Sequence, residues 1–128
     1  MLPLAVKVNK TGNGLFTISP SGSIDSDTYE MLEKSVESVF KSDPKALIFD
    51  MKGVKYISSM GIRVILTAKN RIEELGGSLV MLNLQPQIRK VLDIVRAIPS
   101  QNIFTSREEL DSYLAAIQRK EIDKGRVS

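Results

Sequence analysis

One segment, from Ala46 to Leu75, restricts the fold of this chain more than any other part of its sequence. It opens with a short, continuous apolar run over residues 46–49, which Asp50 closes. Such a run is typical of a strand buried on both faces, as in a sheet covered by helices. After a turn at residues 56–63, apolar residues recur at helical spacing and form one stripe, at Gly61, Ile65, Ala68, Ile72 and Leu75. Gly76-Gly77 then ends the predicted helix, because glycine readily adopts the left-handed conformation of a helix terminus.

Two serines, Ser58 and Ser59, lie where the predicted strand leads into the N-terminus of the predicted helix. The first backbone N–H groups of a helix have no partner within the helix, so a side-chain oxygen at this point can cap them. A second hydroxyl beside such a cap is exposed on the turn. We therefore expect this turn to be the functional region of the chain.

The length and composition are those of one globular domain. The chain has 128 residues, of which 42% are hydrophobic, and a chain of this size can bury roughly two-thirds of its unfolded surface without disulfides or metals. We expect a single domain over residues 1–118. Residues 119–128, where charges of both signs alternate, are expected to form a flexible C-terminal tail.

The residue types that are absent exclude several classes of enzyme. The sequence has no histidine and no cysteine, which excludes Ser-His-Asp and Cys-His nucleophile pairs and imidazole metal sites. Asp50 follows a strand, but no second carboxylate near it indicates a magnesium site. We therefore predict that the protein is not an enzyme and that it has no metal site and no cofactor. A nucleotide or lipid bound between Asp25 and Ser59 stays an open alternative.

The charge and hydropathy pattern gives no indication of a nucleic-acid or membrane partner. The formal net charge is only +3, and the 5% of residues that are aromatic are not interleaved with the basic ones, as base stacking would require. No apolar run approaches the ~20 residues of a membrane span, and residues 1–8 lack the features of a secretion signal. We expect no direct nucleic-acid binding, no membrane insertion, a cytoplasmic location, and a monomer or weak dimer.

The rest of the chain alternates between predicted strands and helices. Besides the central strand we expect strands at residues 4–8, 14–19, 78–82 and 103–104, with a hairpin turn between the first two and an end to the second at Pro20. Helices are expected before Asp43-Pro44, with Asp25, Ser26 or Asp27 as the cap, between Pro86 and Pro99, and after a capping box at Ser106. This order predicts the α/β class, with a small mixed β-sheet of four to five strands and about four helices packed on it.

Five motifs keep a recognisable order and spacing along the chain. They are Ser21-Gly22-Ser23-Ile24-Asp25, Leu47-Ile48-Phe49-Asp50, Val54, the turn at residues 56–62, and Gly76-Gly77. Together they resemble the STAS domain family, and more narrowly the bacterial anti-sigma factor antagonists, over nearly the whole chain from about Leu4 to Leu114. The family fold is a small mixed sheet with helices on it, so the resemblance implies the same α/β architecture.

The resemblance implies that the protein is a phosphorylation-controlled switch. In this family the unphosphorylated antagonist binds an anti-sigma factor, often a serine kinase, and so frees the sigma factor. The kinase phosphorylates a serine at the start of the central helix, and a PP2C-type phosphatase removes the phosphate. Aligned on Gly61, this serine is Ser59, and a shift of one residue would make it Ser58. The sequence departs from the best-known form of the motif at Ser58, where that form has aspartate, and at Met60, where it has serine or alanine.

The resemblance further implies a partner-binding surface near the phosphorylated serine. Its residues would be Asp25, Ser58, Ser59, Met60 and Arg63. Each has a structural alternative: Ser58 or Ser59 is then only a helix cap, and Asp25 caps the first helix. Met60 either contacts the partner or packs beneath the turn, and Arg63 either meets a phosphate or acidic partner or is simply solvated. An alternative function is that of an unphosphorylated STAS interaction subunit, in a stress-sensing scaffold or in a transporter ATPase complex.

Overall fold

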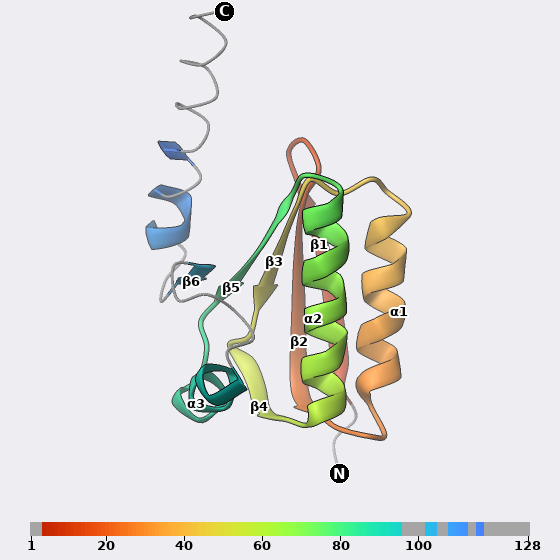
Figure 1. The fold of residues 1–128 in the computed structure, drawn as a ribbon, viewed down its shortest axis with the longest axis vertical. Helices are drawn as coiled ribbons and strands as arrows, with labels where there is room; N and C mark the ends of the chain where they lie inside the picture. The colour runs from red at the N-terminus through yellow and green to blue at the C-terminus, as the bar shows by residue number, and fades with distance from the viewer. Residues whose placement is uncertain (1–3, 96–101, 105–107, 113–114, 117–128) are drawn as a thin grey trace, which may run out of the picture.

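The computed structural model describes residues 4–95, 102–104, 108–112 and 115–116 (Figure 1). The elements in chain order are β1 (Ala5–Thr11), β2 (Leu15–Ile24), α1 (Tyr29–Phe40), β3 (Ala46–Asp50), β4 (Gly53–Ile57), α2 (Ser59–Glu74), β5 (Ser78–Leu82), α3 (Pro86–Val95) and β6 (Ile103–Phe104). Residues 108–112 and 115–116 are also helical, in agreement with the predicted fourth helix. The capping box at Ser106, the end of α3 at Pro99 and the tail at residues 119–128 were also predicted, but they lie outside the described residues.

The strands form one mixed, six-stranded sheet. Strands β1 and β2 are an antiparallel hairpin, and β2, β3, β5 and β6 follow one another in parallel, so the order is β1-β2-β3-β5-β6. Strand β4 lies off this path and pairs in parallel with β2. The predicted mixed α/β architecture is confirmed, and the sheet has one strand more than the expected four to five because β4 was not foreseen.

In one region of the sheet, one strand was predicted too short and another was not predicted. Strand β2 does not end at Pro20 but continues to Ile24, and residues 53–57, for which no strand was predicted, form β4. Long-range pairing explains both differences, because Pro20 and Ser21 still pair with β1, and residues 21–24 of β2 pair with β4, with an irregularity after Gly22. Proline and glycine are poor strand formers by themselves. The long-range pairing overrides this local preference.

A short break between β3 and β4 carries the chain from one half of β2 to the other. Strand β3 pairs with residues 15–18 and β4 with residues 21–24. At the break, Oδ1 of Asp50 accepts hydrogen bonds of 3.2 Å from the backbone N–H of Lys52 and from the side-chain amide of Asn83. Met51 is fully buried, and its N–H donates to the carbonyl of Leu82 at 2.9 Å. The two halves of β2 thus have different neighbours.

Helices α1 and α2 lie side by side on one face of the sheet and run in the same direction, so both N-termini are at one end (Figure 1). The apolar stripe of each helix packs on the sheet, at Leu32, Val36 and Val39 in α1 and at Ile65, Ala68 and Ile72 in α2. Leu75 was expected in this stripe, but it is the C-cap of α2 and is 61% exposed. Gly76, with φ of +82°, ends the helix as predicted.

The opposite face of the sheet carries a second, smaller core. It consists of Ile48, Val80, Leu82, Phe104 and Leu110. Leu110 is completely buried and lies in the helical segment after β6. This segment therefore covers the part of the sheet formed by β3, β5 and β6.

Helix α3 lies beside β4 (Figure 1), and the side chains of Gln87 in its first turn and of Gln85 just before it form hydrogen bonds to backbone carbonyl groups of this strand region. The amide Nε2 of Gln85 donates to the carbonyl of Lys52 at 2.9 Å, and Nε2 of Gln87 donates to the carbonyl of Lys55 at 3.3 Å. Two glutamines thus supply hydrogen bonds that a neighbouring strand would supply in the middle of a sheet.

The loop after β5 gives a first prediction. Asn83 has φ of +58°, a conformation that costs most residues about 1–2 kcal/mol, and its side chain adds the hydrogen bond to Asp50. In urea titrations we expect Asn83→Ala to lower the free energy of unfolding by about 2–3 kcal/mol, because both contributions are lost. The matched variant Asn83→Gly keeps the backbone conformation and should lose only about 1 kcal/mol. Equal losses in both variants would contradict a role for the left-handed backbone.

Candidate functional site

The loops that precede α1 and α2 meet at the C-terminal ends of β2 and β4. Ile24 pairs with Ile57, and the backbone N–H of Ser58 donates to the carbonyl of Ile24 at 2.7 Å. This brings Asp25 and the two serines, which are far apart in sequence, to one edge of the sheet. In open α/β sheets, the carboxyl ends of parallel strands are the usual place for a binding site.

The two serines have different environments. Ser58 is the N-cap of α2: its backbone is extended, and Oγ accepts a hydrogen bond of 3.4 Å from the N–H of Gly61. Of the two serines that sequence analysis left open as the cap, the structure therefore has Ser58. Ser59 is the first residue of α2 and is exposed, and its hydroxyl has no hydrogen-bond partner within the part of the chain that the structure describes. Of the two hydroxyls, that of Ser59 is therefore the exposed one and the one without a described partner.

Asp25 stabilises the turn before α1 and does not cap the helix. Its Oδ1 accepts hydrogen bonds from the N–H of Asp27 at 2.9 Å and of Thr28 at 3.1 Å. The N-cap of α1 is Thr28, which makes no side-chain capping bond to the helix; its hydroxyl donates instead to the carbonyl of Ser23 at 2.7 Å. The prediction that Asp25, Ser26 or Asp27 caps this helix was therefore wrong. The local sequence offers several good capping residues, and the turn uses one of them before the helix begins.

Gly61 allows the first turn of α2 to lie against both strand ends. A Cβ atom at this position would lie 2.5 Å from Cγ2 of Ile24 and 2.7 Å from Cγ1 of Ile57. Both isoleucines are buried, so neither can move easily. The absence of a side chain at Gly61 thus sets how close the two serines come to the loop at Asp25.

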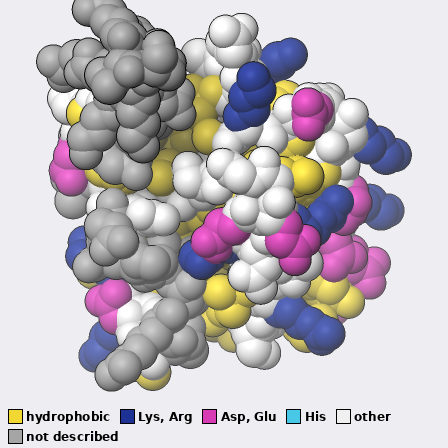
Figure 2. Space-filling view, turned by 45° about the horizontal axis from the view of Figure 1, so that its top comes forward, with side chains coloured by type: hydrophobic (Ala, Val, Ile, Leu, Met, Phe, Trp, Pro, Cys, Tyr) yellow, Lys and Arg dark blue, Asp and Glu magenta, His cyan; other side chains and the backbone are white. Residues whose placement is uncertain are grey.

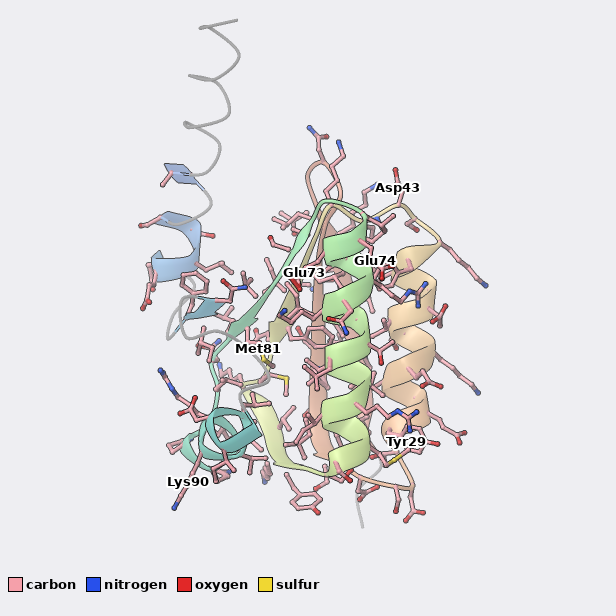
Figure 3. All side chains as sticks on the ribbon, viewed as in Figure 1. Tyr29, Asp43, Glu73, Glu74, Met81 and Lys90 are labelled. Carbon is pink, nitrogen blue, oxygen red and sulfur yellow. The ribbon has the colours of Figure 1, made fainter. Side chains whose placement is uncertain are left out.

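A groove runs between α1 and α2, starting beside Ser59. It consists of two adjoining hollows of ≈ 300 Å³ and ≈ 320 Å³, which share Glu33, Val64 and Thr67. The first hollow is also lined by Tyr29, Met60 and Arg63, and the second by Val36, Glu37, Ala68 and Arg71. We call this feature the α1–α2 groove. Tyr29 marks its end near the start of α2 (Figure 3).

The charged residues of the α1–α2 groove fall into a paired and an unpaired set. Arg71 forms an ion pair with Glu37, and its guanidinium lies 4.0 Å from the ring centre of Phe40, so these three residues bridge the groove at its far end. Glu33 and Arg63 are exposed near the Ser59 end, and neither makes an ion pair with another described residue. Figure 2 shows acidic and basic side chains mixed over one face of the molecule, rather than one basic patch of the kind that binds nucleic acid.

The structure brings together all five residues that sequence analysis assigned to partner binding. Asp25, Ser58 and Ser59 lie at the strand ends, and Met60 and Arg63 lie along the beginning of the groove. Met60 is half-buried and Arg63 is exposed. Sequence analysis did not single out Tyr29, Glu33 or Thr67, because a single helix does not reveal which neighbour its polar side faces. That these residues bind a partner stays a prediction.

The described ranges lack two further kinds of feature. No three His, Cys, Asp or Glu side chains there are grouped so that they could hold a metal ion. No described helix is both long enough and apolar enough to cross a membrane.

Comparison with known protein families identifies the architecture. The sequence profile of the STAS domain matches residues 6–110. The chain belongs to the STAS domain family. Its strand ends, its central helix and the turn with the two serines all lie within the matched region.

Individual STAS proteins resemble the chain over most of its length. BtrV of Bordetella bronchiseptica, provisionally named an anti-sigma factor antagonist, is 27% identical over 96 residues, which are 75% of this chain and 83% of that protein. A crystal structure of an anti-sigma factor antagonist from Mycobacterium paratuberculosis superimposes with a TM-score of 0.73 at 22% identity, covering 90% of this chain and 94% of that one. A sulfate transporter family protein from Wolinella succinogenes gives a TM-score of 0.72 at 17% identity, with 87% and 93% covered. The two structures share the fold of this chain.

The contact at Gly61 gives a second prediction. Gly61→Ala would force apart α2 and the two isoleucines, and overpacking of this kind costs typically 1–3 kcal/mol. We expect the free energy of unfolding to fall by about this amount and backbone amide NMR shifts to change at residues 24–25 as well as 57–62. Changes confined to residues next to Gly61 in sequence would contradict the close approach.

The different roles of the two serines give a third prediction. Ser58→Ala removes the cap of α2 and should lower the free energy of unfolding by about 1 kcal/mol. Ser59→Ala changes an exposed hydroxyl without a partner and should change this energy by less than about 0.5 kcal/mol. Urea titration of both variants measures the difference. The reverse order would exchange the roles of the two serines.

Proposed function

We propose that this STAS domain is a cytoplasmic anti-sigma factor antagonist controlled by phosphorylation of Ser59. In the unphosphorylated state it binds an anti-sigma factor that is also a serine kinase, and so frees the sigma factor. The kinase phosphorylates Ser59, and a PP2C-type phosphatase restores the binding state. The observation that carries the proposal is the free, exposed hydroxyl of Ser59 at the first residue of α2, beside a serine that already serves as the cap. The similarity to named antagonists supports the choice of partner.

The position of Ser59 suits a switch that blocks binding without refolding the domain. A phosphate adds about −1.5 to −2 charges and three acceptor oxygens. At the N-terminus of α2 the helix dipole and the free N–H groups favour this negative charge, so the fold tolerates it. A partner surface fitted to a small neutral hydroxyl does not, and an unmatched charge in an interface costs several kcal/mol. This corresponds to at least a roughly hundredfold loss of affinity.

The alternative is an interaction subunit that works without phosphorylation, in a stress-sensing scaffold or in a transporter ATPase complex. This alternative is supported by the similarity in fold to a sulfate transporter family protein. In both functions the domain is a binding protein and not an enzyme. They differ in whether Ser59 is modified.

The fourth prediction tests the switch directly. Each anti-sigma kinase encoded by the source genome would be purified and incubated with the protein and ATP, followed by intact-mass measurement and peptide mapping. We expect a single phosphate on Ser59, absent in Ser59→Ala and present in Ser58→Ala. Isothermal titration should give an affinity for the kinase that falls roughly a hundredfold or more on phosphorylation. Amide NMR shifts should change only near the site.

Other results would change the assignment in specific ways. A phosphate on Ser58 would move the modified residue by one position. A global change in the NMR spectrum on phosphorylation would contradict a switch that leaves the fold intact. If no kinase binds or phosphorylates the protein, the interaction-subunit alternative replaces the proposal.

A further inference from the structure

We infer that the α1–α2 groove receives a segment of the same anti-sigma factor that covers Ser59. This inference rests on the proposed function and extends it from one serine to a second contact region. The segment would carry an apolar side chain over Val64, a basic side chain facing Glu33 and an acidic side chain facing Arg63. The groove would thus determine which anti-sigma factor is recognised, while Ser59 determines when it binds.

The groove is continuous with the surface around Ser59. Met60 follows Ser59 directly. Arg63 lies four residues after Ser59 in α2, which is about 6 Å along the helix axis. Both line the first hollow together with Tyr29. Because a protein interface of ordinary size buries about 800 Å² on each partner, a partner that covers Ser59 reaches over the opening of the groove.

The shape of the groove fits protein side chains. The floor of the second hollow is apolar, since Val36, Val64 and Ala68 line it and are 3%, 6% and 1% exposed, and Val64 extends into the more polar first hollow. Thr67 and Ala68 are small, so the wall formed by α2 leaves a hollow instead of filling the space between the helices. Each hollow, at ≈ 300 Å³ and ≈ 320 Å³, is at the lower limit of small-molecule sites. A row of two shallow hollows is suited to successive side chains of one segment.

The unpaired charges specify the chemistry of this segment. Glu37 and Arg71 already neutralise one another at the far end, and Arg71 also covers Phe40. Glu33 and Arg63 lie on opposite walls of the first hollow without such partners in the described structure. While solvated, these charges cost little, but a partner that buries them must supply opposite charges or lose several kcal/mol. The occupant is therefore expected to carry charges of both signs.

The fifth prediction uses two pairs of matched variants. Thr67→Trp fills the groove two turns away from Ser59, and Asn70→Trp places the same side chain on an exposed position of α2 that does not line it. Glu33→Lys reverses the charge of the groove wall, and Glu30→Lys makes the same change on an exposed, non-lining position of α1. Affinity for the purified anti-sigma kinase would be measured by isothermal titration. We expect Thr67→Trp and Glu33→Lys to bind roughly tenfold or more weakly and both controls to bind within about twofold of the unmodified protein.

The outcomes separate this inference from the proposal on which it rests. All four substitutions are at exposed positions, and urea titration would establish that each variant is folded. If Thr67→Trp and Glu33→Lys bind like the unmodified protein while phosphorylation of Ser59 still weakens binding, the groove is not used and the inference is wrong. Equal losses in the variants and their controls would also overturn it. If phosphorylation has no effect on binding, the proposed function itself is wrong, and the inference is overturned with it.

Discussion

The parallel pairing of the second half of β2 with β4 determines the geometry of the candidate site. It brings Ile24 next to Ile57 and allows the N–H of Ser58 to bond to the carbonyl of Ile24. Gly61 then lets the first turn of α2 lie directly on these two isoleucines. The turn at Asp25 and the start of α2 are therefore held close together by these contacts, and the side chains of Asp25 and Ser58 add hydrogen bonds within each.

The same pairing explains where sequence reasoning succeeded and where it failed. Apolar periodicity located α1 and α2, and the buried runs located β3 and β5, because burial leaves a direct pattern in the sequence. The extension of β2 and the whole of β4 contain Pro20, Gly22 and Gly53 and show little alternation. They are strands because each pairs with the other, and a pairing between distant segments has no local sequence signal.

The candidate site, like the fold, was predicted only in part from the sequence. The serine motif indicated Ser58 and Ser59, and helix-capping rules left either of them as the cap, which the structure assigns to Ser58. The same rules failed for α1, where Asp25 instead holds the preceding turn. The groove was not predictable from either helix alone. It arises because α1 and α2 run in the same direction on one face of the sheet, so that Glu33 and Arg63 line the same hollow.

The contacts of Gln85 and Gln87 limit how another protein can engage the region around β4. A strand edge with free N–H and carbonyl groups can pair with an added strand, either from a partner peptide or from a second copy of the chain. Gln85 and Gln87 occupy carbonyl groups of Lys52 and Lys55 at the outer edge of the β4 region. In the proposed function, recognition would therefore take place through side chains at the strand ends and along α2. Backbone pairing is reduced as a competing mode of association, and this favours a reversible interaction over an aggregation-prone one.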